Sequence, residues 1–280
     1  MIAAAAAGLI VAGVAGADNS ISFSDTVGDG GTGLDITSVD ISNYEGSLSF
    51  TINVHGSFVC SSDGDGEPAL VALDLDQNPD TGSAFYGTEV AFAPDAIGDA
   101  HLLRARGWDF RGVRQQLGLG GGCGTGVGFY FIDSSKLGLA PNGGFNVVVA
   151  TLGSPGDTAP NIRTFNFQME PGGQPPVLGP DRRAPHVIAY SAGAVHGKAV
   201  GLRYWVLDGR GTTREIIRVY RGKRMLKTIW TPLRDSNPFH LSQVVWRTPS
   251  KVRGRLRFSV RSLDAAGNKS RRSWASLTVR

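Results

Sequence analysis

The sequence predicts an all-β protein made of two β-sandwich domains. Its 280 residues include 39 glycines, and only 19% of the residues are charged. Apolar residues recur at every second position in short runs bounded by Gly, Asp, Asn, Ser or Pro, which is the pattern of strands joined by turns. No apolar stripe with helical spacing follows the first residues. A segment rich in Pro and Gly separates two parts of opposite charge, as expected between two domains.

The first 17 residues predict an export signal. Residues 2–17 are apolar and end in Ala15-Gly16-Ala17, the small-x-small form that a signal peptidase requires. The basic residues usual before such a run are missing, so either a few precede this Met or the segment is an uncleaved anchor. Because about 16 apolar residues are short for a spanning helix, we expect cleavage after Ala17. The protein would then be extracellular or on the cell surface, without a stable transmembrane span.

Residues 18–170 are predicted to form the first sandwich. Alternation indicates about nine strands, with turn signals at short spacing between them. Residues 69–76 are apolar on both sides, which is typical of a central strand. The clearest alternation is at 47–56, where four side chains are expected to face the core: Leu48, Phe50, Ile52 and Val54.

Residues 184–280 are predicted to form the second sandwich. About seven strands in roughly 100 residues are typical of an immunoglobulin-like or fibronectin type III-like domain. Residues 171–183 contain Pro and Gly without periodicity, and we expect a moderately stiff, extended linker there. The expected inward positions belong to two strands: Val200, Leu202, Tyr204, Val206, Leu256, Phe258, Val260 and Ser262.

The net charge of +4 conceals a division between the two domains. Residues 18–170 hold 19 acidic and 6 basic side chains, a net charge of −13, whereas residues 171–280 hold 5 acidic and 22 basic ones, a net charge of +17. Such charge asymmetry between two parts of a chain usually indicates binding to a partner of opposite charge. The basic half would bind an anionic wall polymer, or it would dock against the acidic half of its own chain. The chain has no helix-turn-helix, finger or RNP-like motif, so we expect no nucleic acid partner.

The two cysteines, Cys60 and Cys123, predict one disulfide. An isolated pair in an exported chain usually forms a bridge. Cys123 lies in the run "LGLGGGCGTG", which its glycines predict to be a surface loop. No C-x-x-C motif is present to support a zinc or redox site.

The segment "LDLDQNPDTG" at 73–82 predicts a Ca²⁺ site. Alternate residues of an extended segment point the same way, and Ca²⁺ takes six to eight oxygen ligands. The expected ligands are Asp74, Asp76, Asn78 and Asp80, with Asp25, Asp29 and Asp35 as further oxygen donors. The alternative is a polar turn without metal, since Asp and Asn bond the local backbone. Asp74 lies within an apolar run and is harder to explain in that way, because a buried carboxylate needs a partner.

Arginines alternate with apolar residues near the C-terminus and predict a basic ridge on one sheet face. Such a ridge suits phosphate or carboxylate polymers, although a solvated basic surface is the simpler interpretation. The candidate binding residues are Arg253, Arg255, Arg257 and Arg261, extended by Arg221, Lys223 and Arg224.

The motifs "FSDTVGDG", "VALDLDQNPDTGS" and "GFYFIDSSKLG" give residues 21–170 a family resemblance. The segment resembles DOMON-like and family 9 carbohydrate-binding-module-like sandwiches of exported bacterial proteins. The resemblance implies a sugar-binding or haem-binding sandwich. That family's haem-binding Met/His pair and sugar-clamping tryptophans have no evident counterpart here. Residues 184–280 resemble the bacterial Ig-like domains appended to surface proteins, which implies fold alone.

Catalytic motifs are not visible in the sequence. The five histidines are scattered, and none lies beside G-x-S-x-G or H-E-x-x-H. We therefore expect no enzyme. The leading hypothesis is an exported, non-catalytic binding or adhesion protein for an extracellular glycan or an anionic cell-wall polymer, with Ca²⁺ in its acidic domain. The alternatives are a structural surface protein without a small ligand and a haem or redox carrier of the DOMON type.

Overall fold

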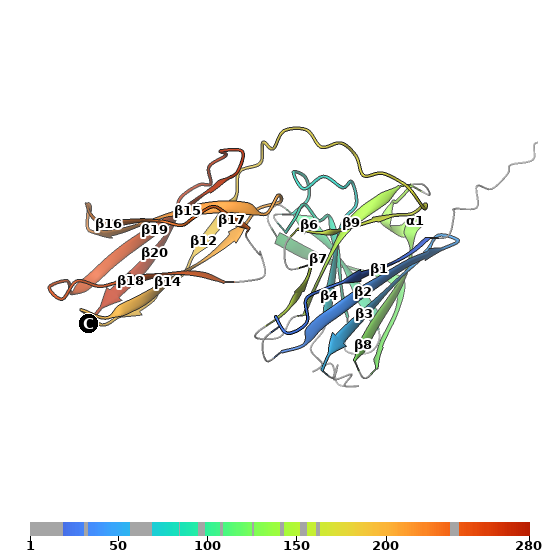
Figure 1. The fold of residues 1–280 in the computed structure, drawn as a ribbon, viewed down its shortest axis with the longest axis horizontal. Helices are drawn as coiled ribbons and strands as arrows, with labels where there is room; N and C mark the ends of the chain where they lie inside the picture. Colours follow the sequence, from blue (N-terminus) through green and yellow to red (C-terminus); the bar gives the residue numbers. More distant parts are fainter. Residues whose placement is uncertain are drawn as a thin grey trace, which may run out of the picture.

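A computed structural model gives the fold and confirms the all-β class (Figure 1). It describes residues 19–30, 33–56, 69–83, 85–94, 99–106, 109–124, 126–140, 143–151, 156–160, 163–235 and 241–280. The predicted signal segment, residues 1–17, lies outside this set. Two β-sandwich domains lie side by side, and the linker passes from one to the other as a long arch.

The N-terminal domain is one folded, antiparallel sheet. Its strands follow the order β1-β2-β3-β8-β7-β6-β5-β4-β9-β10, and β11 also pairs with β9. A single helical turn, α1 (Ser134–Leu137), follows β8. The strands are β1 (Asn19–Ser24), β2 (Asp35–Tyr44), β3 (Ser47–His55), β4 (Ala69–Asp74), β5 (Val90–Pro94), β6 (Asp99–Arg106), β7 (Asp109–Gly124), β8 (Val127–Asp133), β9 (Gly144–Thr151), β10 (Thr158–Ala159) and β11 (Phe165–Gln168).

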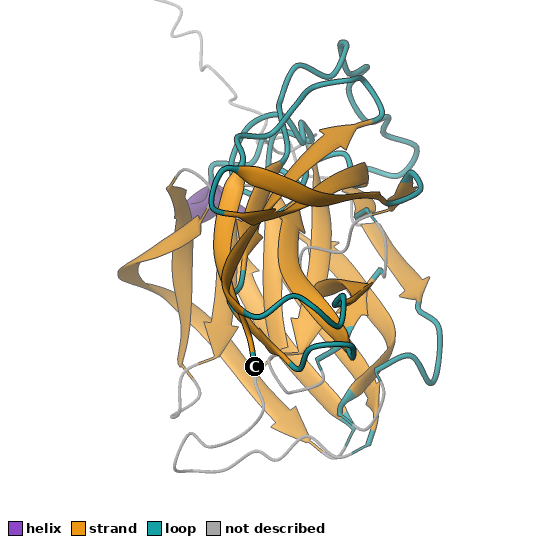
Figure 2. Ribbon diagram, turned by 90° about the vertical axis from the view of Figure 1, so that its left-hand side faces the viewer, coloured by secondary structure: helices purple, strands orange, loops and turns teal. Residues whose placement is uncertain are grey.

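The two ends of this sheet meet and enclose the core. Phe23 of β1 stacks on Phe165 of β11 with ring centroids 4.7 Å apart, and Asn19 Nδ2 donates to the Gln168 carbonyl at 2.7 Å. The alternating side chains of β3 lie inside, as expected from the sequence, because they are almost fully buried: Leu48, Phe50, Ile52 and Val54. Figure 2 shows the strands of this domain behind those of the C-terminal domain.

The glycine-rich run around Cys123 was predicted to be a loop, and that prediction is wrong. Residues 117–124 belong to β7, a strand of 16 residues. The last five residues of β7 pair in register with β8, with Cys123 opposite Gly128. Glycine lowers strand propensity but leaves the backbone donors and acceptors intact, so pairing on both sides, with β6 and β8, outweighs local preference.

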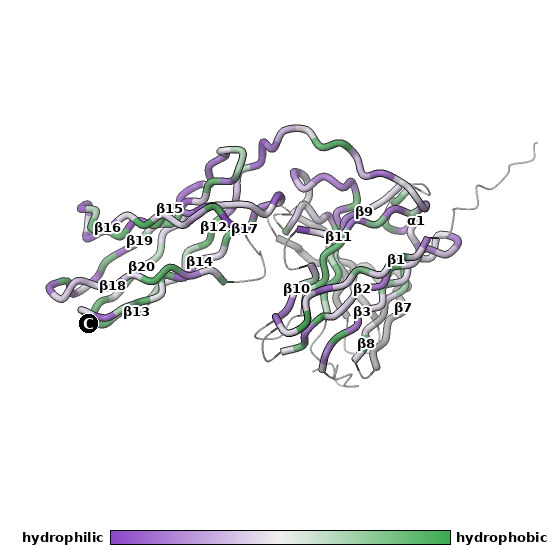
Figure 3. Tube along the Cα trace, in the orientation of Figure 1, coloured by the Kyte–Doolittle hydropathy of each residue, from purple (hydrophilic) through white to green (hydrophobic). Residues whose placement is uncertain are grey.

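The C-terminal domain is a sandwich of two sheets. One has the order β12-β14-β18, and the other has the order β13-β20-β19-β15-β16 with β17 on β15. Hydrophobic and hydrophilic positions alternate along its strands (Figure 3). The strands are β12 (His186–Ala189), β13 (Ala192–Ala194), β14 (Ala199–Leu207), β15 (Thr212–Arg221), β16 (Arg224–Trp230), β17 (Arg234–Asp235), β18 (Ser242–Arg247), β19 (Gly254–Asp264) and β20 (Ser273–Val279).

The core of this domain confirms the predicted inward faces of β14 and β19. Every predicted inward position is at most 8% exposed: Val200, Leu202, Tyr204, Val206, Leu256, Phe258, Val260 and Ser262. Between β11 and β12 the chain forms no strand, and most residues of 171–182 are exposed. The described part of the chain contains no helix that is both long enough and apolar enough to span a membrane.

Candidate functional site

The predicted Ca²⁺ segment begins where β4 ends in a buried carboxylate. Asp74 is fully buried. Its Oδ1 accepts the Asn78 backbone N–H at 2.9 Å, and its Oδ2 accepts Asn146 Nδ2 at 2.8 Å. Burial raises the pKa of Asp74 to about 8, against the effect of the Asn146 hydrogen bond. Asp74 therefore anchors the loop that follows it, and charging its carboxylate in this place is unfavourable.

Asp74 shares its surroundings with Asp76 and Glu89, and we call these three residues the loop triad. Their carboxylate oxygens lie within 4.8 Å of one another. Glu89 Oε2 accepts the Leu75 N–H at 2.7 Å, and its Oε1 lies 3.1 Å from Thr81 Oγ1. Burial also raises the pKa of Glu89. Three convergent carboxylates, two of which (Asp76 and Glu89) also contact the Thr81 hydroxyl, form an oxygen-rich group of the kind that hard cations use.

Of the other two predicted ligands, Asn78 contacts the triad through its backbone N–H, which donates to Asp74 and Asp76. Asn78 Oδ1 accepts the Asp80 N–H at 3.2 Å. Asp80 faces the C-terminal domain and forms a bidentate ion pair with Arg210, with contacts of 2.8 Å and 3.2 Å. The structure thus brings Asp74 and Asp76 together with Glu89, and it separates Asp80 from them. Sequence spacing missed Glu89 because it reaches the triad from the far side of the loop.

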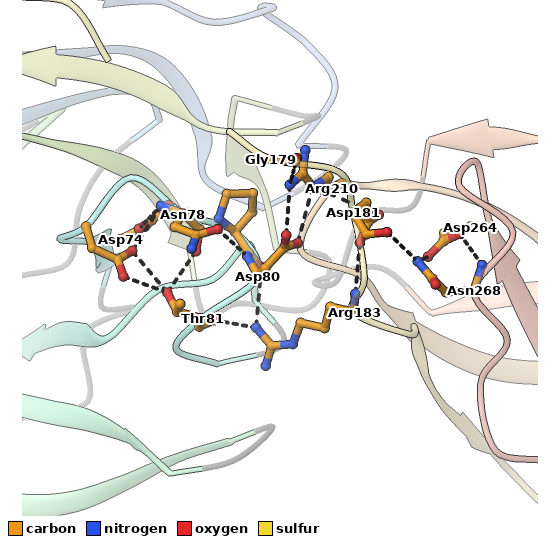
Figure 4. A network of polar contacts seen from close by, with 12 residues as sticks. Asp74, Asn78, Asp80, Thr81, Gly179, Asp181, Arg183, Arg210, Asp264 and Asn268 are labelled. Atoms are coloured by element: carbon orange, nitrogen blue, oxygen red, sulfur yellow. Dashed lines mark hydrogen bonds and ion pairs between the residues drawn. The ribbon is translucent and has the colours of Figure 1, made fainter. Parts of the chain in front are cut away.

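The same loop forms the contact between the two domains, which we call the domain joint (Figure 4). Arg183, the last residue of the predicted linker, directs its guanidinium into the turn at 79–83. Nη1 donates to the carbonyls of Thr81, of Ser83 at 3.0 Å and of Pro79 at 3.3 Å, and Nη2 donates to the Gly82 carbonyl at 2.9 Å. A planar cation with several donors suits such a ring of carbonyls.

Two turns of the C-terminal domain complete the domain joint. Gly209, between β14 and β15, lies so close to Pro79 that a Cβ at residue 209 would overlap the Pro79 carbonyl. From the turn between β19 and β20, Asn268 Nδ2 donates to the Asp181 carbonyl at 3.2 Å. Asp181 Oδ2 lies 4.0 Å from Arg210. The linker and both turns therefore contact the acidic loop or one another.

A second acidic cluster contains Asp25 and Asp29 together with Asp157, which the sequence did not indicate. Burial raises the pKa of Asp25 to about 7 and also raises that of Asp157. Asp35 borders this trio through a hydrogen bond with Asp29, and its oxygens also accept the Gly28 N–H at 2.7 Å and the Gly30 N–H at 3.0 Å. Burial would raise the pKa of Asp35, but these backbone donors outweigh it and lower the value.

The predicted basic residues follow one sheet and its edge. Arg255, Arg257 and Arg261 alternate with buried residues along β19. Arg253 precedes β19, and its Nη2 lies 2.8 Å from His196 Nε2. Arg221, at the end of β15, donates to the Arg253 carbonyl at 3.3 Å. The last two predicted residues are exposed at the β15–β16 hairpin: Lys223 and Arg224.

Aromatic rings lie among these arginines. The Arg257 guanidinium carbon lies 4.4 Å from the Trp274 ring centroid and 5.9 Å from that of Tyr220. Arg214 lies 6.0 Å from the Trp230 centroid. The sequence missed these partners because strand register alone brings them together. We define the arginine–aromatic face by its outward side chains: Arg214, Arg218, Tyr220, Trp230, Arg255, Arg257, Arg261 and Trp274.

This face carries unneutralised positive charge. Within the described residues, no outward position of β15, β16, β19 or β20 holds Asp or Glu, and no ion pair joins its arginines to a carboxylate. The acidic residues Glu215 and Asp264 on the same strands point inward and are buried.

The predicted disulfide stays a prediction. Cys60 lies outside the described residues, and only the backbone of Cys123 is described, within β7.

Comparisons with known proteins identify no family. No family model matches the chain, and no curated protein matches it. The PKD domain of a peptidase from a Thermoplasmatales archaeon matches with a TM-score of 0.25 at 15% identity, over 34% of this chain and 92% of that one. The fibronectin type III-like modules of Clostridium thermocellum CbhA match with a TM-score of 0.25 at 12% identity, over 84% of this chain and 85% of that one.

A third match is the CARDB domain of a Pyrococcus furiosus protein, solved with two metal ions. It has a TM-score of 0.23 at 13% identity, over 35% of this chain and 86% of that one. Scores this low assign the chain to no family, and the resemblance of residues 21–170 to DOMON-like modules stays a prediction.

Proposed function

We propose that this protein is an exported, non-catalytic surface protein that binds an acidic polysaccharide through the arginine–aromatic face. The observation that supports this most is the gathering of five arginines on one face, none of which forms an ion pair with a carboxylate of the described residues. Positive charge without an internal partner attracts polyanions over distances of about 10 Å at moderate salt.

The aromatic rings favour a sugar polymer over a simple phosphate chain. Trp230 is 55% exposed and Trp274 is 42% exposed, which is unusual for side chains whose rings are normally buried. Flat rings offer an apolar surface to the C–H face of a pyranose, and the guanidinium fork matches a carboxylate. Arg257, held against Trp274, presents both groups side by side. Uronate units carry both complementary features.

The proposal is tested by measuring the affinity of the full chain for polygalacturonate at several salt concentrations. We expect binding that weakens steeply with salt. The double variant Arg255→Gln/Arg257→Gln should lose at least about tenfold in affinity, because two charge-assisted contacts are removed. The matched control is Arg203→Gln/Arg247→Gln, which removes the same charge from exposed positions on β14 and β18 of the opposite sheet.

Three outcomes contradict this function. An equal loss of polygalacturonate affinity in the two double variants would show that binding depends on net charge alone and not on this face. Tighter binding of polyphosphate than of polygalacturonate would make the ligand a phosphate polymer. A protein that binds neither polymer would be a structural surface protein.

We also propose that Ca²⁺ binds at the loop triad of Asp74, Asp76 and Glu89. A cation would offset the unfavourable burial of Asp74, whose pKa burial raises to about 8. The triad offers three carboxylates and the Thr81 hydroxyl, and water would supply the remaining ligands. Asp80 is not part of this proposal, because Arg210 occupies both of its oxygens.

The calcium proposal is tested by thermal unfolding with and without about 10 mM Ca²⁺. Weak extracellular sites have Kd values of about 0.1–1 mM, so the expected stabilisation is about 1–3 kcal/mol. Asp76→Asn should abolish this response, whereas Asp29→Asn, in the second acidic cluster, should retain it. If Ca²⁺ does not stabilise the parent protein, the triad only stabilises the loop and binds no cation. If Asp29→Asn alone abolishes the response to Ca²⁺, the ion binds at the second acidic cluster instead of the triad.

A further inference from the structure

A cavity opens where the linker enters the C-terminal domain, beside the domain joint. Its volume is about 720 Å³, which lies within the usual range for small-molecule sites of about 300–1,000 Å³. Residues from three segments line it, namely the linker end with β12, the end of β14, and the turn before β20. Sequence analysis did not indicate this cavity, because these segments are distant along the chain.

The lining carries an unequal set of charges. Lys269, Arg271 and Arg272 lie on the turn before β20, and none of them has an ion-pair partner among the described residues. Lys269 and Arg271 are exposed. Asp208 is the single carboxylate of the lining. A ligand with a negative group would therefore find cations on one wall and an acceptor on another.

Asp208 provides the second polar feature of the cavity. It is 3% exposed, and its Oδ2 has no hydrogen-bond partner among the described residues. Burial raises the pKa of Asp208 to about 7, with the neighbouring Asp181 acting in the same direction. A buried oxygen without a donor is costly, and a ligand hydroxyl would satisfy it.

The cavity adjoins the arginine–aromatic face. Arg272 lines the cavity, and its guanidinium carbon also lies 5.6 Å from the Trp274 ring centroid. On the same ring lies Arg257 at 4.4 Å. Trp274 with its two arginines therefore links the face to the cavity.

We propose that this cavity binds one acidic sugar unit of the polysaccharide, with its carboxylate on Lys269 and Arg271 and a hydroxyl on Asp208. This inference rests on the proposed function, because it identifies the site that selects the unit while the face holds the rest of the chain. Cations and a carboxyl acceptor in one lining distinguish a uronate from a neutral sugar or a bare anion.

The test is the affinity of the full chain for trigalacturonate, which is too short to span the face, compared with its affinity for polygalacturonate. Lys269→Gln/Arg271→Gln alters two exposed side chains, so the fold is expected to persist. It should weaken trigalacturonate binding about tenfold. Asp208→Asn, which keeps the side-chain size, should also weaken it. Arg203→Gln/Arg247→Gln is the matched control and should leave both ligands unaffected.

The outcomes separate this inference from the function on which it rests. If Lys269→Gln/Arg271→Gln binds trigalacturonate normally while Arg255→Gln/Arg257→Gln loses polygalacturonate, the cavity is not the sugar site and the proposed function stands. Equal affinity for a neutral galactose trimer also overturns the inference. If the parent protein binds no polygalacturonate, both proposals fail.

Discussion

The two domains use their excess charge in opposite ways. In the N-terminal domain, three carboxylates turn inward: Asp35, Asp74 and Asp157 are buried and accept hydrogen bonds from the backbone. In the C-terminal domain, arginines such as Arg255 and Arg257 turn outward and have no acidic partner. Charge of one sign holds loops together, and charge of the other sign has no ion-pair partner among the described residues. Net charge alone would not distinguish these roles.

The largest expected effect comes from comparing the replacement of one inward carboxylate with that of one outward arginine. Asp35→Ala leaves the Gly28 and Gly30 N–H groups without an acceptor, and we expect a loss of about 2–4 kcal/mol in the free energy of unfolding. Arg257→Ala should cost less than about 1 kcal/mol, because it loses only contacts with exposed rings. Urea denaturation measures both. Equal losses would contradict the division of roles.

The domain joint is the place where the two kinds of charge meet, and Arg183→Ala should remove its central contact. The carbonyls of Thr81, Gly82 and Ser83 would lose their donor, at a cost of about 2 kcal/mol. The unfolding transitions of the two domains should then separate in calorimetry. The neighbouring exposed Arg182→Ala is the control and should change neither transition. Identical behaviour of the two variants would mean that Arg183 does not hold the domains together.

The free energy of unfolding should fall as pH rises, because burial raises the pKa values of several carboxyl groups in the folded state. The folded pKa is about 7 for Asp25 and Asp208 and about 8 for Asp74, compared with an ordinary value of 3.8. Between pH 4 and these values the folded state holds more protons than the unfolded state, so the free energy of unfolding decreases with pH.

For Asp74 alone, the expected slope is up to about 1.4 kcal/mol per pH unit. Denaturant titrations without Ca²⁺ at pH 5, 6, 7 and 8 measure it, and Asp74→Asn should give a shallower slope. A stability that stays flat or rises over this window would contradict the description of these groups.

The smallest expected effect belongs to the ion pair between Asp80 and Arg210, whose side chains are 22% and 27% exposed. Asp80→Asn or Arg210→Gln should cost less than about 1 kcal/mol, and 1 M salt should reduce this further. A double-mutant cycle on these two residues isolates their coupling. A coupling above about 2 kcal/mol would make this pair, instead of Arg183, the main contact of the joint.

Sequence analysis predicted local features well and distant ones poorly. The strand at 47–56 and the inward residues of β14 follow from a period of two, since a buried face restricts the register. Strand β7 was missed because glycine gives no alternation. The contact of Arg183 with Thr81 joins residues 102 positions apart, and Glu89 reaches the triad across a loop. No spacing rule reveals such pairs.

The position of Arg183 has a practical consequence for dissecting the chain. By sequence it ends the linker, and by contact it belongs to the loop of the domain that precedes the linker. A fragment that begins at residue 184 lacks this side chain. In a fragment that ends at residue 170, the loop carbonyls that accept hydrogen bonds from Arg183 lose their donor. Two fragments cut at the boundaries that composition suggests would therefore lack the Arg183 contact when mixed. A C-terminal fragment that starts at Asp181 retains Arg183 and is the better one for testing whether the two domains associate.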